Sequence, residues 1–151
     1  MTQRQRRAGF TFIEVLVVML IVGILSGIGY MRFGSTFQRS RVRAAANLIA
    51  GDVQTAQFLA GRERTPIILT LNTSARTYTI ATRAGDTTYV RRDLTSAGDY
   101  GVDTLRTTAT SIQFFPNGFT SGSASLTVAT GSYSRIVTVS RAGQVRVTTG
   151  S

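Results

Sequence analysis

The sequence predicts an α+β fold in which a long N-terminal helix, transmembrane in its first half, packs on a C-terminal antiparallel β-sheet or sandwich domain. Three patterns indicate this arrangement. Residues 10–31 are apolar almost without interruption, residues 32–64 carry apolar side chains at helical spacing, and residues 65–151 alternate at strand spacing between short turns. The 151 residues are enough for one ordinary domain, so we expect the three segments to form a single architecture.

The first helical segment, residues 10–31, contains 22 residues and one charged side chain, Glu14. At 1.5 Å per residue it is about 33 Å long, enough to cross the hydrocarbon core of a bilayer. The preceding residues 1–9 include three Arg and no acid, so we expect the N-terminus in the cytoplasm and the remainder across the membrane. A secretory signal peptide is the alternative, but its apolar region would be shorter and a clear cleavage site would follow it.

The second helical segment, residues 32–64, is predicted to be an amphipathic continuation of the first. Its apolar residues recur at steps of four and three, which places them on one face of a helix. They are Val42, Ala46, Ile49, Val53, Ala56 and Ala60. Thr65 precedes Pro66, and a residue before proline avoids the α conformation, so the helix is expected to end near Arg64.

The remaining residues, 65–151, are predicted to form a β-rich globular domain. About seven short strands are separated by turns that contain Gly, Pro, Asn or Asp. The expected strands lie near residues 67–72, 77–80, 87–92, 111–115, 124–130, 135–140 and 144–148. The segment from Leu94 to Thr110 shows no clean period, and we expect a loop-rich connection there.

The composition excludes most catalytic chemistry. There is no Cys and no His, which excludes thiol nucleophiles, disulfides, the usual zinc sites and imidazole acid–base catalysis. Asp99 and Asp103 are four positions apart, but no base, metal ligand or phosphate-binding loop stands near them in the sequence. We therefore expect no enzyme, no cofactor and no metal site.

The chain is strongly basic, with 17 basic residues, all of them Arg, against 7 acidic residues and a formal net charge of +10. Such a balance is typical of proteins whose partners are nucleic acids, anionic lipids or acidic proteins. A solvated surface rich in Arg is the alternative, and composition alone does not separate the two.

Glu14 is the most informative single residue, because an ionisable side chain inside an apolar segment is costly and indicates function by default. The alternative is that its carboxylate reaches the membrane interface, since Glu14 lies close to the edge of the segment. The residues around it read RRAGFTFIEVLVVMLIVGIL.

This stretch resembles the N-terminus of type IV pilins and type II secretion pseudopilins. In that family a basic leader ends in Gly and is followed by Phe, with Glu at the fifth mature position; here these are Gly9, Phe10 and Glu14. The resemblance implies cleavage between Gly9 and Phe10 by a prepilin peptidase, N-methylation of Phe10, and residence in the bacterial inner membrane before assembly with other pilin or pseudopilin subunits into a periplasmic or surface filament.

A physical role for Glu14 follows from that cleavage. The new amine of Phe10 must be buried among apolar helices in a filament, and a buried charge needs a partner. A carboxylate one helical turn along is well placed to meet the amine of a neighbouring subunit. We therefore expect Glu14 to set the register between subunits.

The C-terminal half resembles the GspH/FimT type of pseudopilin, in which a sheet domain ends with a strand, a Gly turn and a basic strand. The matching stretches begin at Phe115, Ser125, Arg135 and Gly143. The resemblance implies a minor pseudopilin of type II secretion or, alternatively, a FimT-like minor pilin that binds double-stranded DNA non-specifically. Candidate DNA contacts are Arg135, Arg141 and Arg146, although Gln144 stands where the DNA-binding members have a basic residue.

Overall fold

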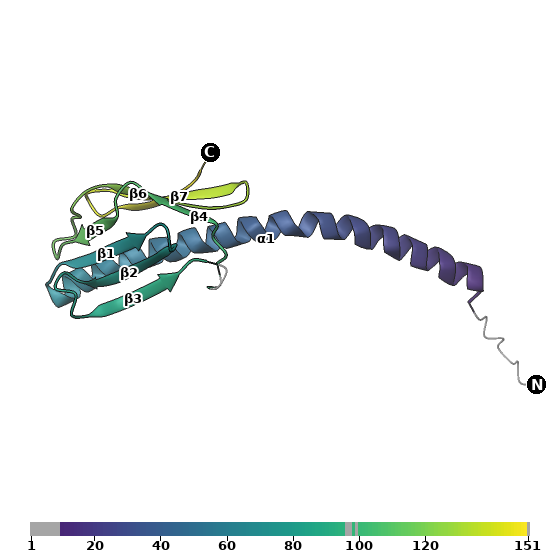
Figure 1. The fold of residues 1–151 in the computed structure, drawn as a ribbon, viewed down its shortest axis with the longest axis horizontal. Helices are drawn as coiled ribbons and strands as arrows, with labels where there is room; N and C mark the ends of the chain where they lie inside the picture. Colours follow the sequence, from purple (N-terminus) through teal and green to yellow (C-terminus); the bar gives the residue numbers. More distant parts are fainter. Residues whose placement is uncertain (1–9, 96–97, 99, 151) are drawn as a thin grey trace, which may run out of the picture. The chain divides into compact units, whose positions relative to one another are not determined.

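The computed structural model describes residues 10–95, 98 and 100–150, without the side chains of residues 28–35. The described residues form one helix and eight strands (Figure 1). The helix is α1 (Phe12–Glu63). The strands are β1 (Ile67–Asn72), β2 (Thr77–Thr82), β3 (Thr88–Asp93), β4 (Thr104–Thr107), β5 (Ser111–Phe114), β6 (Ala124–Thr130), β7 (Tyr133–Val139) and β8 (Val145–Thr149). The α+β fold predicted from the sequence is confirmed.

The ends of α1 are set by local chemistry. Thr11 precedes the helix, and the amide of Glu14 donates to the Thr11 carbonyl at 3.1 Å and to its Oγ1 at 3.4 Å. This is an N-cap, and it starts the helix at Phe12, two residues later than expected. At the other end Arg64 has a φ of 54°, a left-handed conformation that ends an α-helix, and Pro66 follows. The predicted end near Arg64 is confirmed.

The chain divides into two compact units, residues 1–36 and 37–151. In the first unit every large apolar side chain from Phe10 to Leu25 is 47–84% exposed. Within the described part of the chain, no helix is long and apolar enough to cross a membrane; the predicted span at residues 10–31 extends into residues 28–31, whose side chains lie outside that part. The predicted leader, residues 1–9, also lies outside the described residues.

The second unit contains two antiparallel sheets of four strands each, with the orders β3-β2-β1-β5 and β4-β6-β7-β8. Seven of the strands lie where alternation predicted them. The expectation of a loop from Leu94 to Thr110 is wrong in part, because β4 forms there and pairs with β6 through Leu105 and Val128. β4 is short and Leu105 is its only buried side chain, so its alternation is too brief to stand out from the surrounding Thr and Ala residues.

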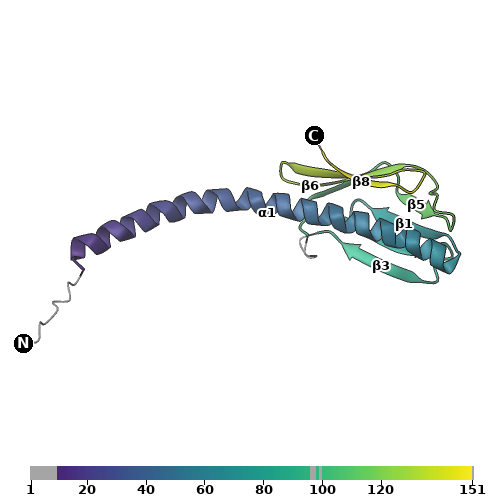
Figure 2. The same ribbon diagram turned by 180° about the vertical axis from the view of Figure 1, so that it is seen from behind.

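The core of this unit lies between the C-terminal half of α1 and the two sheets. All six residues of the predicted apolar stripe are buried, joined by Ala45 and Leu59. They form one cluster with residues such as Ile67 and Tyr78 of the first sheet and Leu126 and Val137 of the second. In Figures 1 and 2 this half of α1 runs alongside both sheets. The amphipathic pattern of residues 32–64 therefore predicts the buried helix face correctly.

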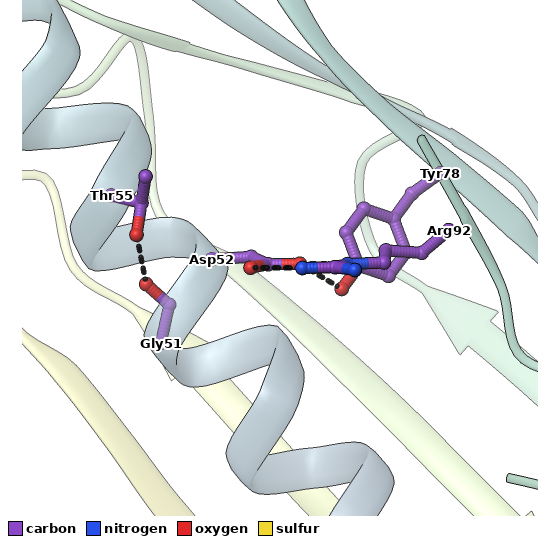
Figure 3. A network of polar contacts seen from close by, with 5 residues as sticks. All are labelled: Gly51, Asp52, Thr55, Tyr78 and Arg92. Atoms are coloured by element: carbon purple, nitrogen blue, oxygen red, sulfur yellow. Dashed lines mark hydrogen bonds and ion pairs between the residues drawn. The ribbon is translucent and has the colours of Figure 1, made fainter. Parts of the chain in front are cut away.

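A polar network crosses this core at Asp52, one residue before the stripe position Val53 (Figure 3). The Tyr78 hydroxyl donates to Asp52 Oδ2 at 2.7 Å, and Arg92 donates to the same carboxylate from Nε at 2.9 Å. Burial of the Tyr78 hydroxyl and its hydrogen bond to Asp52 raise the pKa of Tyr78 far above its usual range. The hydrogen bond to Asp52 raises the pKa of Arg92 as well. Asp52 thus ties α1 to both β2 and β3.

Replacing Asp52 with Ala is expected to lower the free energy of unfolding by about 2–3 kcal/mol, because the buried Tyr78 hydroxyl loses a charged acceptor. The Arg92 pair contributes less, since 42% of its side chain is exposed. Glu63→Ala is the control: it removes an exposed pair with Arg62 on the same helix and should change stability by no more than about 0.5 kcal/mol. Denaturant unfolding followed by circular dichroism measures both, and equal losses would contradict the role of Asp52.

Candidate functional site

The candidate assembly residues Phe10 and Glu14 lie on one side of the start of α1. Together with Val15, Val18 and Met19 they line a shallow apolar depression. The Glu14 carboxylate has no ion-pair or hydrogen-bond partner among the described residues. Its position leaves it free for a group from another molecule. Gly9, the expected last leader residue, lies outside the described residues.

Thr11 is a structural residue of this site that the sequence analysis overlooked. Thr11 and Glu14 form the pattern Thr-x-x-Glu, in which the first residue caps the helix and the third helical residue is acidic. Phe10 precedes the cap and lines the same depression as Val15, as in a hydrophobic staple. The spacing of Thr11 and Glu14 in the sequence already indicates this cap. Because the Glu14 carboxylate makes no hydrogen bond among the described residues, its local contribution is that of a negative charge in the first turn of α1.

The candidate DNA contacts lie on the hairpin of β7 and β8. Arg146 pairs with Thr138 across the hairpin and is exposed, while Val145 and Val147 pack against the core. This arrangement agrees with the alternation of the sequence. Arg141 is exposed in the turn that joins the two strands.

Arg135 lies apart from the other two. It pairs with Thr149, three residues along β7 from the Thr138–Arg146 pair, which corresponds to about 10 Å. On β7 it also has the same phase as Val137 and Val139, which are buried, so it occupies the face of the sheet opposite to Arg146. The structure therefore brings Arg141 and Arg146 towards one end of the hairpin and leaves Arg135 at the other end.

The turn that carries Arg141 is held by contacts from two other segments. Gln57 of α1 donates from Nε2 to the Gly143 carbonyl at 2.5 Å, and the Thr120 amide donates to the Arg141 carbonyl at 3.0 Å. An open groove of about 720 Å³ lies beside the turn, lined by Gln54 and Gln57 of α1 and by residues of the hairpin that include Arg146. Among the described residues no cluster of three or more acidic side chains is placed to hold a metal ion.

Two sequence families match the chain. The prokaryotic N-terminal methylation motif matches residues 4–30, a range that contains Gly9, Phe10 and Glu14. The family of the type II transport protein GspH matches residues 45–143, about two thirds of the chain. The chain belongs to the GspH family.

Solved structures share the fold of this GspH-family protein. The type IV minor pilin FimU of Pseudomonas aeruginosa is 16% identical with a TM-score of 0.60, and the match covers 73% of this chain and 90% of FimU. The minor pseudopilin EpsH from the type 2 secretion system of Vibrio cholerae is 12% identical with a TM-score of 0.58, covering 72% of this chain and 97% of EpsH. No curated protein matches the sequence.

The matched GspH region ends at Gly143, so the turn is inside it and Arg146 is beyond it. Gly143 itself has a φ of 78°, and a Cβ at this position would lie 2.5 Å from the Gly118 carbonyl oxygen. Both the backbone conformation and the close approach require glycine here. The position of the Arg141 turn in this GspH-family protein therefore depends on a residue without a side chain.

Gly143→Ala is expected to lower the free energy of unfolding by about 2 kcal/mol, because the left-handed conformation and the contact with Gly118 both become unfavourable. Hydrogen exchange of the Thr120 amide, which donates to the Arg141 carbonyl, should also become faster, since the turn has to move. Gly122→Ala is the matched control, because a Cβ there meets no atom within 4 Å. Thermal unfolding and exchange of the two variants measure the effect, and similar behaviour of both would refute it.

Proposed function

We propose that this GspH-family protein is a minor pseudopilin, a structural filament subunit of a type II secretion system. A prepilin peptidase cleaves it between Gly9 and Phe10, Phe10 is N-methylated, and α1 assembles with the helices of other subunits. The observation that carries this proposal is the match of the methylation motif to residues 4–30, a range that contains Gly9, Phe10 and Glu14. The GspH match over residues 45–143 supports the type II assignment.

The exposed apolar side chains of the first unit support a bilayer and then a filament as their surroundings. Apolar surface of this extent is unfavourable in water, so it needs lipid or other helices around it. In this proposal the protein first crosses the inner membrane once, with its N-terminus in the cytoplasm and residues 65–151 in the periplasm. It then moves into the filament, where neighbouring subunits replace the lipid.

Glu14 acts in this proposal as the partner for the cationic amine of a neighbouring subunit's Phe10. The carboxylate has no partner among the described residues of its own chain. When helices surround it, an unpaired carboxylate becomes costly, whereas a paired one is stabilised. Only one axial offset between two subunits brings amine and carboxylate together, so the pair fixes the register.

Glu14→Gln is expected to reduce incorporation into filaments at least about tenfold, because it removes the charge that balances the amine. Gln also serves at this position of a capping box, so the start of α1 is preserved. Thr11→Ala is the control, since it weakens the cap and keeps the carboxylate. The measurement compares the amount of each variant in sheared filaments with the amount in membranes.

Mass spectrometry of the same samples reads the processing step separately, because the mature chain should begin with methylated Phe10 in both variants. Normal incorporation of Glu14→Gln would contradict the role of the charge. A loss in Thr11→Ala as large as that in Glu14→Gln would assign the effect to helix capping.

The alternative is a FimT-like minor type IV pilin that binds double-stranded DNA during uptake. The favouring observation is that residues 104–151 contain four Arg and no acid, with Arg141 and Arg146 exposed towards the turn of one hairpin. Guanidinium groups placed this way would contact phosphates without reading sequence. Arg135 lies at the other end of the hairpin and would contribute less.

If DNA is the partner, the chain will bind duplex DNA with an affinity that falls steeply as the salt concentration rises. The double variant Arg141→Gln, Arg146→Gln will make the negative slope of log K against log salt shallower by about 1.8. Arg106→Gln, an exposed substitution on β4, is the control, and Arg135→Gln should resemble it. Fluorescence anisotropy with labelled duplexes over a salt series measures these slopes. Absence of binding at low salt would exclude the DNA-binding alternative and leave the type II secretion subunit as the remaining proposal.

A further inference from the structure

A small basic cleft lies beside α1 at the end of the β7–β8 hairpin away from the turn. It has a volume of about 200 Å³. Its lining residues are Arg39, Val42, Ser132, Tyr133, Ser134, Arg135, Thr149 and Gly150. Two of these side chains are guanidinium groups and none is a carboxylate, so the cleft favours an anion.

Both guanidinium groups are available to a ligand. Arg39 lies over the ring of Tyr133, with 5.4 Å between its Cζ and the ring centroid, which orients the group while leaving its N–H edges free. Arg135 is half-buried on the core-facing side of β7. Neither has an ion pair or a hydrogen bond among the described residues. A half-buried cation without a counter-charge is costly, and a bound anion would supply one.

The chemistry of the cleft matches a phosphate group. Guanidinium groups present paired N–H donors that suit the oxygens of phosphate. Thr149 pairs with Arg135 across the hairpin, so its hydroxyl lies on the same face of the sheet as a further donor. A volume of about 200 Å³ is below the usual range of pockets for larger organic ligands, about 300–1,000 Å³, and accommodates a single phosphate. We propose that this cleft binds the phosphate of an anionic phospholipid headgroup.

The position of Arg39 in the sequence favours lipid over other sources of phosphate. It follows the apolar segment 10–31 by eight residues, and Arg41 and Arg43 come next. A basic side chain this near the end of a membrane segment lies within about a Debye length of the lipid headgroups, and anionic headgroups of the leaflet on that side attract it. A DNA backbone would need several phosphate contacts along a ridge, whereas this cleft takes one. In its choice of lipid, the inference rests on the proposed insertion of residues 10–31 into a bilayer.

The first arm of the test titrates the full chain, in an uncharged detergent and at constant ionic strength, with inorganic phosphate. Backbone amide NMR signals of Tyr133 and Gly150 should shift and saturate. Arg135→Gln and Arg39→Gln should each raise Kd about tenfold, since each removes a charge-assisted contact. Arg106→Gln removes the same charge from exposed β4 and should stay within about twofold. Equal weakening in all three variants, or no saturation, would overturn the site.

The second arm adds phosphatidylglycerol or phosphatidylcholine to the micelles, or duplex DNA to the solution, and measures which of the three displaces bound phosphate. Displacement by phosphatidylglycerol, lost in Arg135→Gln, supports the lipid. Bound phosphate that phosphatidylglycerol leaves in place assigns a free anion, and displacement by duplex DNA alone assigns a nucleic acid; either overturns the lipid ligand. Arg39 is exposed, so the Arg39→Gln variant should fold and still tests the site if Arg135→Gln unfolds. Glu14→Gln should bind phosphate normally, so failure of this site and failure of the filament proposal are distinguishable.

Discussion

Burial of one face of α1 against two sheets is the constraint on which the second unit depends. Ile49 and Val53 are completely buried, and four further positions of the buried face are Ala, which lets the helix backbone approach the strands closely. The same stretch of helix also supplies the polar contacts that position the rest. Asp52 holds β2 and β3, Gln57 holds the hairpin turn, and Arg39 contributes to the basic cleft. A shift of the helix along its axis would therefore disturb all three at once.

Periodicity predicts those parts of the fold that bury one face in a regular pattern. The apolar stripe of α1 and seven strands follow directly from spacing, because each regular element must place its apolar residues on the same side. β4 could not be predicted this way, since four residues with one buried side chain carry too little pattern. Its existence depends on pairing with β6, which is a tertiary contact.

The features of the candidate site also differ in whether local sequence patterns predict them. The motif at Gly9, Phe10 and Glu14 is local and can be recognised in the sequence. The helix cap at Thr11 could also have been predicted, from its spacing to Glu14. The alternation of Arg135 with Val137 and Val139 could have predicted that Arg135 and Arg146 lie on opposite faces of the sheet. The polar network at Asp52 could not have been predicted, because its partners Tyr78 and Arg92 are 26 and 40 residues away and nothing in the sequence connects them. The meeting of Arg39 with Tyr133 is likewise a product of the folded chain.

The edges of the two sheets bear on how copies of this chain associate. Three of the four edge strands carry an exposed Arg, namely Arg91 on β3, Arg106 on β4 and Arg146 on β8, and the fourth, β5, is bridged through Phe114 to Thr120. Charges on edge strands oppose strand-to-strand polymerisation, which is the aggregation route open to any exposed sheet. The sheet edges of the second unit are thereby poor templates for amyloid-like pairing, whereas the apolar side chains from Phe10 to Leu25 stay exposed, so contacts between copies favour the helix surface over the strand edges.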